Sequence, residues 1–270
     1  MPEDLTAPLL DPEIYTTNPH PDFARLRAEA PVAWNQKVGF WAITKHADVS
    51  SISKDHETFC SAKGILLFEI GAEYRTPPTM MHTDPPDHTR YRKLVQPGFK
   101  PSFIRGLEPS VRRRAKALVE KIEPGQPVDL VQEVSVPLPL QIISDLLGVP
   151  GEDWERFLEW SEAAIPGATD WPEEKRNALH REMVEYLLAT TSARRASPRE
   201  DIISELAQAR VDGESLTDDE LAMFLVQLLV AGNETTRNML SGGFVALADH
   251  PAQWDRLRRD PALISLAVEE

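Results

Sequence analysis

The chain has 270 residues, of which 41% are hydrophobic and 27% charged, as in an ordinary globular protein with a sizeable core. Its formal net charge of −14 argues against nucleic acid as a general partner. The single cysteine, Cys60, excludes an internal disulfide framework and fits a reducing compartment, and we expect it to be a small, partly buried side chain. The acidic, proline-containing start is unlike a signal peptide, and the longest apolar run is too short to cross a bilayer. We therefore expect a cytoplasmic protein without membrane insertion.

The N-terminal part predicts short, mixed elements. Pro21 and the apolar spacing of "PHPDFARLRAEAP" predict a first helix. Two short apolar runs around a glycine-containing turn predict a β-hairpin at about residues 31–45, followed by a short helix in "KHADVSSISKD". Residues 61–78 read as an irregular loop that contains the apolar run "GILLF". Loops of this length are usually functional or mobile.

From His88 onward the pattern is almost wholly helical. Periodicity and cap signals predict helices near residues 88–96, 101–122, 137–147, 151–164, 172–195, 199–210, 217–249, 251–258 and 261–270. No internal repeat or low-complexity linker is visible. The sequence thus predicts a single domain, residues 1–270, that is mainly α with a small N-terminal β element.

The longest predicted helix, residues 217–249, begins with a capping box formed by Thr217 and Glu220. At 1.5 Å per residue it spans about 50 Å, enough to traverse a whole domain. It is apolar on nearly every side, so other helices must wrap around it. Where that wrapping is incomplete, we expect the apolar faces around Leu225, Leu228 and Leu229 to be less covered.

At the centre of this helix stands "AGNETTR". Thr235 lies four residues after Ala231, so its hydroxyl can reach the Ala231 carbonyl, and Gly232 lowers the cost of distortion. We expect a local opening of the helix with the Glu234 carboxylate beside it. An acid next to an alcohol in an apolar body is suited to proton delivery. The alternative is a kink with incidental polar residues.

A second constellation is "MMHTDPPDHTRYRKLVQPGF". The prolines after Asp84 predict an extended chain and then a helix, in which His88 and Arg92 share a face and can both donate to an anion. One alternative is a capped helix with a basic exposed face. Another is a metal site from His82, Asp84 and His88, which offers three ligands without a fourth. Residues 88–121 carry ten Lys or Arg against two Glu, which suggests a local anion site or a solvated helix face.

Together these stretches resemble the cytochrome P450 family, specifically the soluble bacterial haem-thiolate monooxygenases. "AGNETT" is similar to the family's oxygen-activating motif, and "HTDPPDHTRYRKLV" to the segment that binds the haem propionates. The order of the hairpin, "HETF", "DPPDHTRYR", "DLLGVP", "AGNETT" and "LADHPAQWDRLRRDP" follows the family throughout the chain.

The resemblance implies a role for each matching residue. Glu234 and Thr235 would relay protons to dioxygen, with Ala231 and Gly232 bordering the oxygen groove. His88 and Arg92 would hold the propionates of haem b. The loop "KGILLFEIG" would roof a pocket for a lipophilic small molecule, although ordinary core packing explains its apolar residues equally well. The pocket-facing residues would be Ile65, Leu66, Leu67 and Phe68.

The resemblance also implies an electron donor, either a ferredoxin-type protein or a flavin reductase. An acidic donor would dock on outward-facing members of the basic segment. These are drawn from Lys93, Lys100, Arg105, Arg112, Arg113 and Arg114.

The family's haem-ligating cysteine has no counterpart here, because Cys60 lies in "HETFCSAKG" and lacks the glycine- and phenylalanine-rich context. Glu270 resembles the glutamate of the family's Glu-x-x-Arg pair, cut off before its arginine. We therefore expect the N-terminal two-thirds of a longer enzyme, truncated before the haem-ligand loop, with no metal ligand in this chain and the axial cysteine beyond Glu270. Alternatives are a non-catalytic helical protein with a lipophilic pocket, or a degenerate family member. A carboxylate-bridged metal oxidase is disfavoured because no Glu-x-x-His pair occurs.

Overall fold

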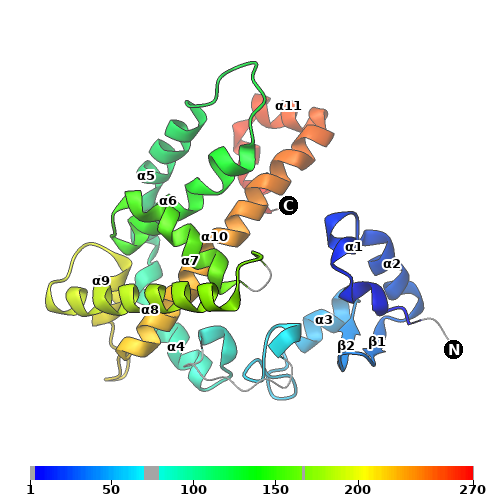
Figure 1. Ribbon diagram of the computed structural model, residues 1–270, viewed down its shortest axis with the longest axis horizontal. Coiled ribbons are helices and arrows are strands. Elements are labelled where there is room, and N and C mark those ends of the chain that lie inside the picture. Colours follow the sequence, from blue (N-terminus) through cyan, green and yellow to red (C-terminus); the bar gives the residue numbers. More distant parts are fainter. Residues whose placement is uncertain (1–3, 70–78, 166–167, 270) are drawn as a thin grey trace. The chain divides into compact units, whose positions relative to one another are not determined.

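The computed structural model describes residues 4–69, 79–165 and 168–269, and the side chains of Phe68 and Glu152 lie outside this description (Figure 1). The chain divides into two compact units, Met1–Tyr91 and Arg92–Glu270, each of which is described by itself. The single domain expected for residues 1–270 stays a prediction.

The first unit holds short helices and one β-hairpin. Its named elements are α1 (Pro12–Thr16), α2 (His20–Glu29), β1 (Val32–Asn35), β2 (Phe40–Ile43), α3 (His46–Ile52) and the start of α4 (Asp87–Val95). Strands β1 and β2 pair antiparallel, with Trp34 opposite Trp41 and their rings 5.1 Å apart between centroids. The turn between them contains Gly39 at φ +85°, a conformation that favours glycine. The predicted hairpin is confirmed.

The second unit is helical. Its α-helices are α5 (Pro101–Val119), α6 (Pro137–Leu147), α7 (Trp154–Ala164), α8 (Glu173–Ala196), α9 (Ile202–Gln208), α10 (Asp218–Asp249), α11 (Pro251–Arg259) and α12 (Ile264–Glu269). Each predicted helix is present, but the ends differ. The helix predicted at 199–210 begins only at Ile202, because the Asp201 side chain caps it by accepting the Ser204 N–H at 2.7 Å. A π-helical turn, Val131–Ser135, was not expected.

Helix α10 forms the centre of this unit and packs against α6, α7 and α8 (Figure 1). The predicted capping box is confirmed: Thr217 Oγ1 accepts the Glu220 N–H at 3.2 Å, and Glu220 Oε2 accepts the Thr217 N–H at 2.8 Å. These two bonds satisfy N–H groups that have no partner within the helix. The start of the helix is thereby fixed by residues three positions apart.

The exposed apolar surface of α10 lies further along than we expected. Leu225 and Leu229 are fully buried and Leu228 is half-buried, so the expectation that this region is poorly covered was wrong. The physical reason is that α6, α7 and α8 pack against α10, and most of residues 221–229 lie among its buried positions. Exposed apolar side chains occur instead in the second half, at Met239 and Val245.

A buried ion pair joins the ends of α6, α8 and α9. Arg194 of α8 bonds the Asp201 carboxylate through Nε and donates through Nη2 to the Gly148 carbonyl at 2.8 Å. The Arg194 and Asp201 side chains are only 7% and 1% exposed. Gly148 caps α6 at φ +65°, and a Cβ at this position would clash with an Asp201 carboxylate oxygen. This explains on physical grounds why the "DLLGVP" motif has glycine here.

Candidate functional site

The "AGNETT" stretch lies in the middle of α10, between the buried first half and a second half in which Met239 and Val245 are exposed. Thr235 Oγ1 donates to the Ala231 carbonyl at 2.6 Å, as its four-residue spacing predicted. The helix is continuous from Asp218 to Asp249, so the expected local opening was wrong. The hydroxyl bond is made in addition to an intact backbone helix.

The structure gives Gly232 a different reason for being glycine. A Cβ on Gly232 would lie 3.2 Å from Ile143 Cδ1 of α6, tighter than ordinary contact. The absence of a side chain therefore lets α6 and α10 approach closely. The side of α10 that carries Gly232 faces α6, whereas Ala231 and Thr235 are exposed.

Glu234 is half-buried and lies about 100° around the helix from Thr235, as adjacent residues do. Because Thr235 gives its proton to the Ala231 carbonyl, its oxygen keeps two lone pairs with which to accept a hydrogen bond. The stretch thus offers a carboxylate and an accepting hydroxyl one residue apart. This arrangement can store a proton and pass it on.

Sequence reasoning missed the role of Asn233. Its side chain is buried, and its Nδ2 donates to Ser161 Oγ of α7 at 3.1 Å. Ser161 is itself fully buried. The only available signal was a polar residue that continues the apolar i, i+4 ridge of Leu225 and Leu229, which a single sequence cannot distinguish from an exposed asparagine.

His88 and Arg92 lie one turn apart in α4, as predicted. His88 is half-buried and Arg92 is exposed. The backbone N–H of His88 donates to the Asp84 carbonyl at 3.0 Å, which ties the helix start to the preceding segment. Both side chains carry N–H donors, so this face of α4 can bind an anion.

The alternative metal site from His82, Asp84 and His88 finds no support in the geometry. The His82 ring contacts Glu69 Oε1 at 3.1 Å through Nε2. The Asp84 carboxylate accepts the Ser61 N–H at 2.8 Å. Within the described residues, no three His, Cys, Asp or Glu side chains gather as a metal site would require. His82 and Asp84 instead hold the described part of the preceding loop, residues 61–69.

That loop is the one expected to face a lipophilic molecule. Ile65, Leu66 and Leu67 are 39%, 46% and 45% exposed, whereas the side chain of Phe68 lies outside the described residues. Glu69 Oε2 accepts the N–H groups of Ile65 and Leu66 at 2.7 and 2.9 Å. A buried carboxylate thus holds the backbone while the apolar side chains stay accessible.

Cys60 is exposed, so the expectation of a partly buried side chain was wrong. The statistical tendency of cysteine to be buried does not apply here, because the neighbouring turn is itself at the surface. Among the described residues nothing gathers around Cys60 as a set of metal ligands.

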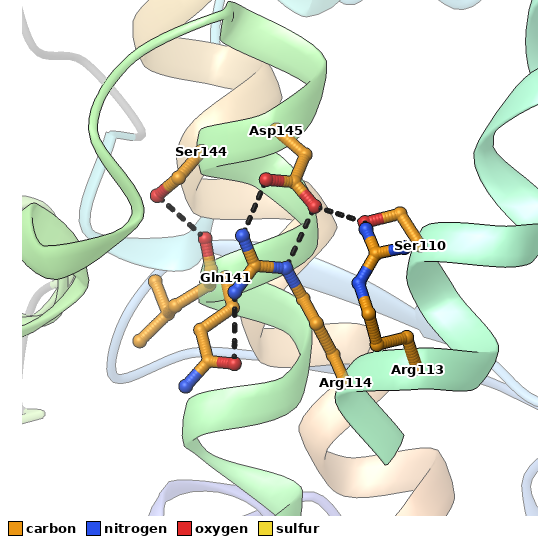
Figure 2. Close-up of polar contacts among 7 residues, drawn as sticks. Ser110, Arg113, Arg114, Gln141, Ser144 and Asp145 are labelled. Atoms are coloured by element: carbon orange, nitrogen blue, oxygen red, sulfur yellow. Dashed lines mark hydrogen bonds and ion pairs between the residues drawn. The ribbon is translucent and has the colours of Figure 1, made fainter. Parts of the chain in front are cut away.

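In the basic segment, residues 88–121, one arginine is held in an ion pair between helices and others are exposed. Figure 2 shows Arg114 of α5 bound to Asp145 of α6, with Nε donating to Oδ2 at 2.7 Å and Nη2 to Oδ1. Ser110 donates to the same carboxylate at 2.5 Å, and Gln141 Oε1 accepts from Arg114 at 3.2 Å. Burial would raise the pKa of Asp145, but the bonds from Arg114 and Ser110 outweigh it and lower that pKa. Arg114 therefore serves α5–α6 packing.

The remaining cations of α5 point outward. Arg112 contacts Glu108 one turn earlier on an open surface, where the two side chains are 78% and 67% exposed. Arg113 and Arg105 are also exposed. Pairs of this kind contribute little to stability, so these charges are available to a partner.

The comparisons with known proteins agree with one another. A sequence model described as "Cytochrome P450" matches residues 128–261. Linalool 8-monooxygenase of Pseudomonas putida is 37% identical over 280 residues, covering 97% of this chain and 69% of that protein. A steroid C26-monooxygenase of Mycobacterium bovis is 36% identical, covering 92% of this chain and 62% of that protein.

Solved structures give the same result for the fold. A cytochrome P450 from Chondromyces apiculatus superposes with a TM-score of 0.85 and 33% identity, covering 99% of this chain and 66% of that one. The chain therefore spans between 62% and 69% of the length of these three proteins. Across the described residues, no helix combines the length and apolar character needed to cross a membrane.

Proposed function

The chain belongs to the cytochrome P450 family, and from this premise we propose that the whole protein is a haem-thiolate monooxygenase that inserts one atom of O2 into a lipophilic small molecule. The observation that carries the proposal is the Thr235 hydroxyl, bonded to the Ala231 carbonyl on an uncovered face of α10 with Glu234 beside it. Two similar proteins are named for the oxygenation of linalool and of a steroid, both lipophilic.

The residues present fit haem b in part. The N–H donors of His88 and Arg92 match the carboxylate chemistry of its propionates, and the small Ala231 leaves the uncovered face of α10 without a bulky side chain. Bound through a thiolate, haem supplies the activation of O2. We assign its iron no ligand within residues 1–270, because Cys60 has neither a suitable sequence context nor neighbouring ligands in the described structure.

In the proposed mechanism, this chain's residues manage protons. Glu234 takes a proton from solvent on its carboxylate and passes it towards Thr235 Oγ1, which has lone pairs to accept it. Thr235 then donates its own proton away from the Ala231 carbonyl to the oxygen that is being reduced. Ala231 keeps this face free of a bulky side chain, Gly232 lets α6 approach from the other side, and the half-burial of Glu234 limits how many water molecules reach it.

The remaining assignments concern substrate and electrons. The exposed apolar residues Ile65, Leu66 and Leu67 contact the substrate. A ferredoxin-type protein or a flavin reductase with an acidic surface docks on the exposed cations of α5. Arg114 is left out of this surface because Asp145 binds it.

The proposal is tested by Thr235→Ala in the whole protein. We expect haem to be retained while NAD(P)H consumption yields peroxide in place of product, because proton delivery loses its last donor. Thr236→Ala is the matched control, since it makes the same chemical change at the next position of the helix. Product formed per NAD(P)H is the measurement. If Thr235→Ala couples as well as the control, Thr235 is not part of the mechanism; if neither protein oxidises any lipophilic compound, the non-catalytic alternative is favoured.

A further inference from the structure

Gly232 and Asn233 fix how the "AGNETT" stretch of α10 is rotated about the helix axis. With about 100° between neighbours on a helix, Gly232 and Asn233 point in two different directions, one towards α6 and the other towards α7. These two contacts determine which way the following residues, Glu234 and Thr235, point. Gly232 acts by steric fit alone, so the directional contact is that of Asn233.

The Asn233 contact is unusual for its position. It continues a ridge of α10 in which Leu221, Leu225 and Leu229 are fully buried among apolar groups. A buried amide without a hydrogen-bond partner is costly, so the ridge tolerates asparagine only if the amide is bonded. The bond from Nδ2 to Ser161 Oγ supplies this partner at 3.1 Å. Asn233 Oδ1 meets no donor in the described part of the chain, so this single bond holds the amide.

We propose that Asn233, held by Ser161, is a positioning residue that sets the direction of Glu234 and Thr235 towards the uncovered face of α10. The inference rests on the proposed function of that pair. An apolar side chain at residue 233 would pack, but it would allow α10 to rotate slightly against α7. A small rotation moves the Thr235 hydroxyl relative to the molecule it serves, because a reacting group tolerates little misplacement.

The test uses the whole haem-containing protein and three variants: Ser161→Ala, Asn233→Leu and the double variant. Each single change removes the bond, and product formed per NAD(P)H should fall about two- to tenfold, the factor that corresponds to one hydrogen bond. The KM for substrate should stay unchanged. Ser161→Thr, which keeps the hydroxyl, should restore coupling.

The double variant separates positioning from stability. Because both polar groups are gone, its resistance to unfolding should recover relative to Ser161→Ala, while its coupling stays low. Leu229→Ala is the control on the same ridge, and it should weaken stability with normal coupling. If coupling recovers together with stability in the double variant, Asn233 has only a packing role and the inference fails.

Failure of the premise would look different. If Thr235→Ala itself leaves coupling unchanged, the proposed function fails and the positioning role falls with it. If Thr235→Ala lowers coupling but Ser161→Ala and Asn233→Leu do not, the proposed function stands and the positioning role is refuted.

Discussion

Arg194 offers a sharp test of how much one buried ion pair contributes to this fold. Arg194→Met keeps a long apolar side chain but removes the guanidinium that bonds both Asp201 and the Gly148 carbonyl. Asp201 Oδ1 keeps the Ser204 N–H, whereas Oδ2 loses its charged partner. The carboxylate would then be 1% exposed and uncompensated.

The expected magnitude follows from that burial. Leaving one charge of a buried pair without its partner costs about 3–5 kcal/mol of the free energy of unfolding. Arg112→Met is the matched control, because the Arg112–Glu108 pair is 78% and 67% exposed and such a pair contributes less than about 1 kcal/mol. The two variants make the same chemical change and differ in burial.

Urea unfolding of the whole protein, followed by far-UV circular dichroism, measures both effects. Haem occupancy must be matched between samples, because a bound cofactor complicates a two-state analysis. We expect Arg194→Met to unfold at a much lower midpoint urea concentration and Arg112→Met to unfold at nearly the midpoint of the parent protein. The dependence of the free energy of unfolding on urea concentration should be similar in both variants. Equal, small losses in the two variants would refute the reasoning that the joint between α6, α8 and α9 depends on this pair.

Three further predictions follow from the charges and from the context of the single cysteine. Reversing Arg105, Arg112 and Arg113 to Glu, with Arg114 intact, should slow association with an acidic electron donor and weaken its salt dependence in stopped-flow measurements; unchanged rates would place docking elsewhere. Burial lowers the pKa of His180, so stability is lost as pH falls below about 6.5, where the unfolded chain binds a proton first; His180→Gln should lose less stability than the parent between about pH 7.5 and 5. Residues 1–270 alone, mixed with haemin and reduced under carbon monoxide, should bind haem weakly, lack the thiolate-type band and show no monooxygenase activity, whereas the whole protein shows the band and the activity; a thiolate-type band from the short chain would make Cys60 the ligand.

What the sequence predicted well depends on residues close together in the chain. The capping box of Thr217 and Glu220 involves a separation of three residues, and the Thr235–Ala231 bond a separation of four. Helical periodicity alone fixes such geometry, because these side chains meet wherever the helix forms. The hairpin and the order of helices followed from the same kind of local signal.

What the sequence did not predict depends on contacts between distant residues. Asn233 and Ser161 are 72 positions apart, and no local pattern marks them as partners. Gly232 was interpreted as a point of helix opening, but its neighbour Ile143 shows that it serves close packing. Arg114 was grouped with docking cations because its charge was visible in the sequence and its partner Asp145 was not.

The difference in burial between the two halves of α10 has a consequence for biosynthesis. Helix α10 packs against α6, α7 and α8, and its Phe224 contacts Phe99; these three helices and Phe99 leave the ribosome before α10 does. The first half of α10 can therefore dock as soon as it is translated, without waiting for anything downstream. In the second half Leu240 also packs on earlier-made residues, Leu118, Val134 and Leu138, but Met239 and Val245 stay exposed. A nascent chain paused just after α10 should accordingly resist protease along the buried first half of α10 and present Met239 and Val245 to chaperones.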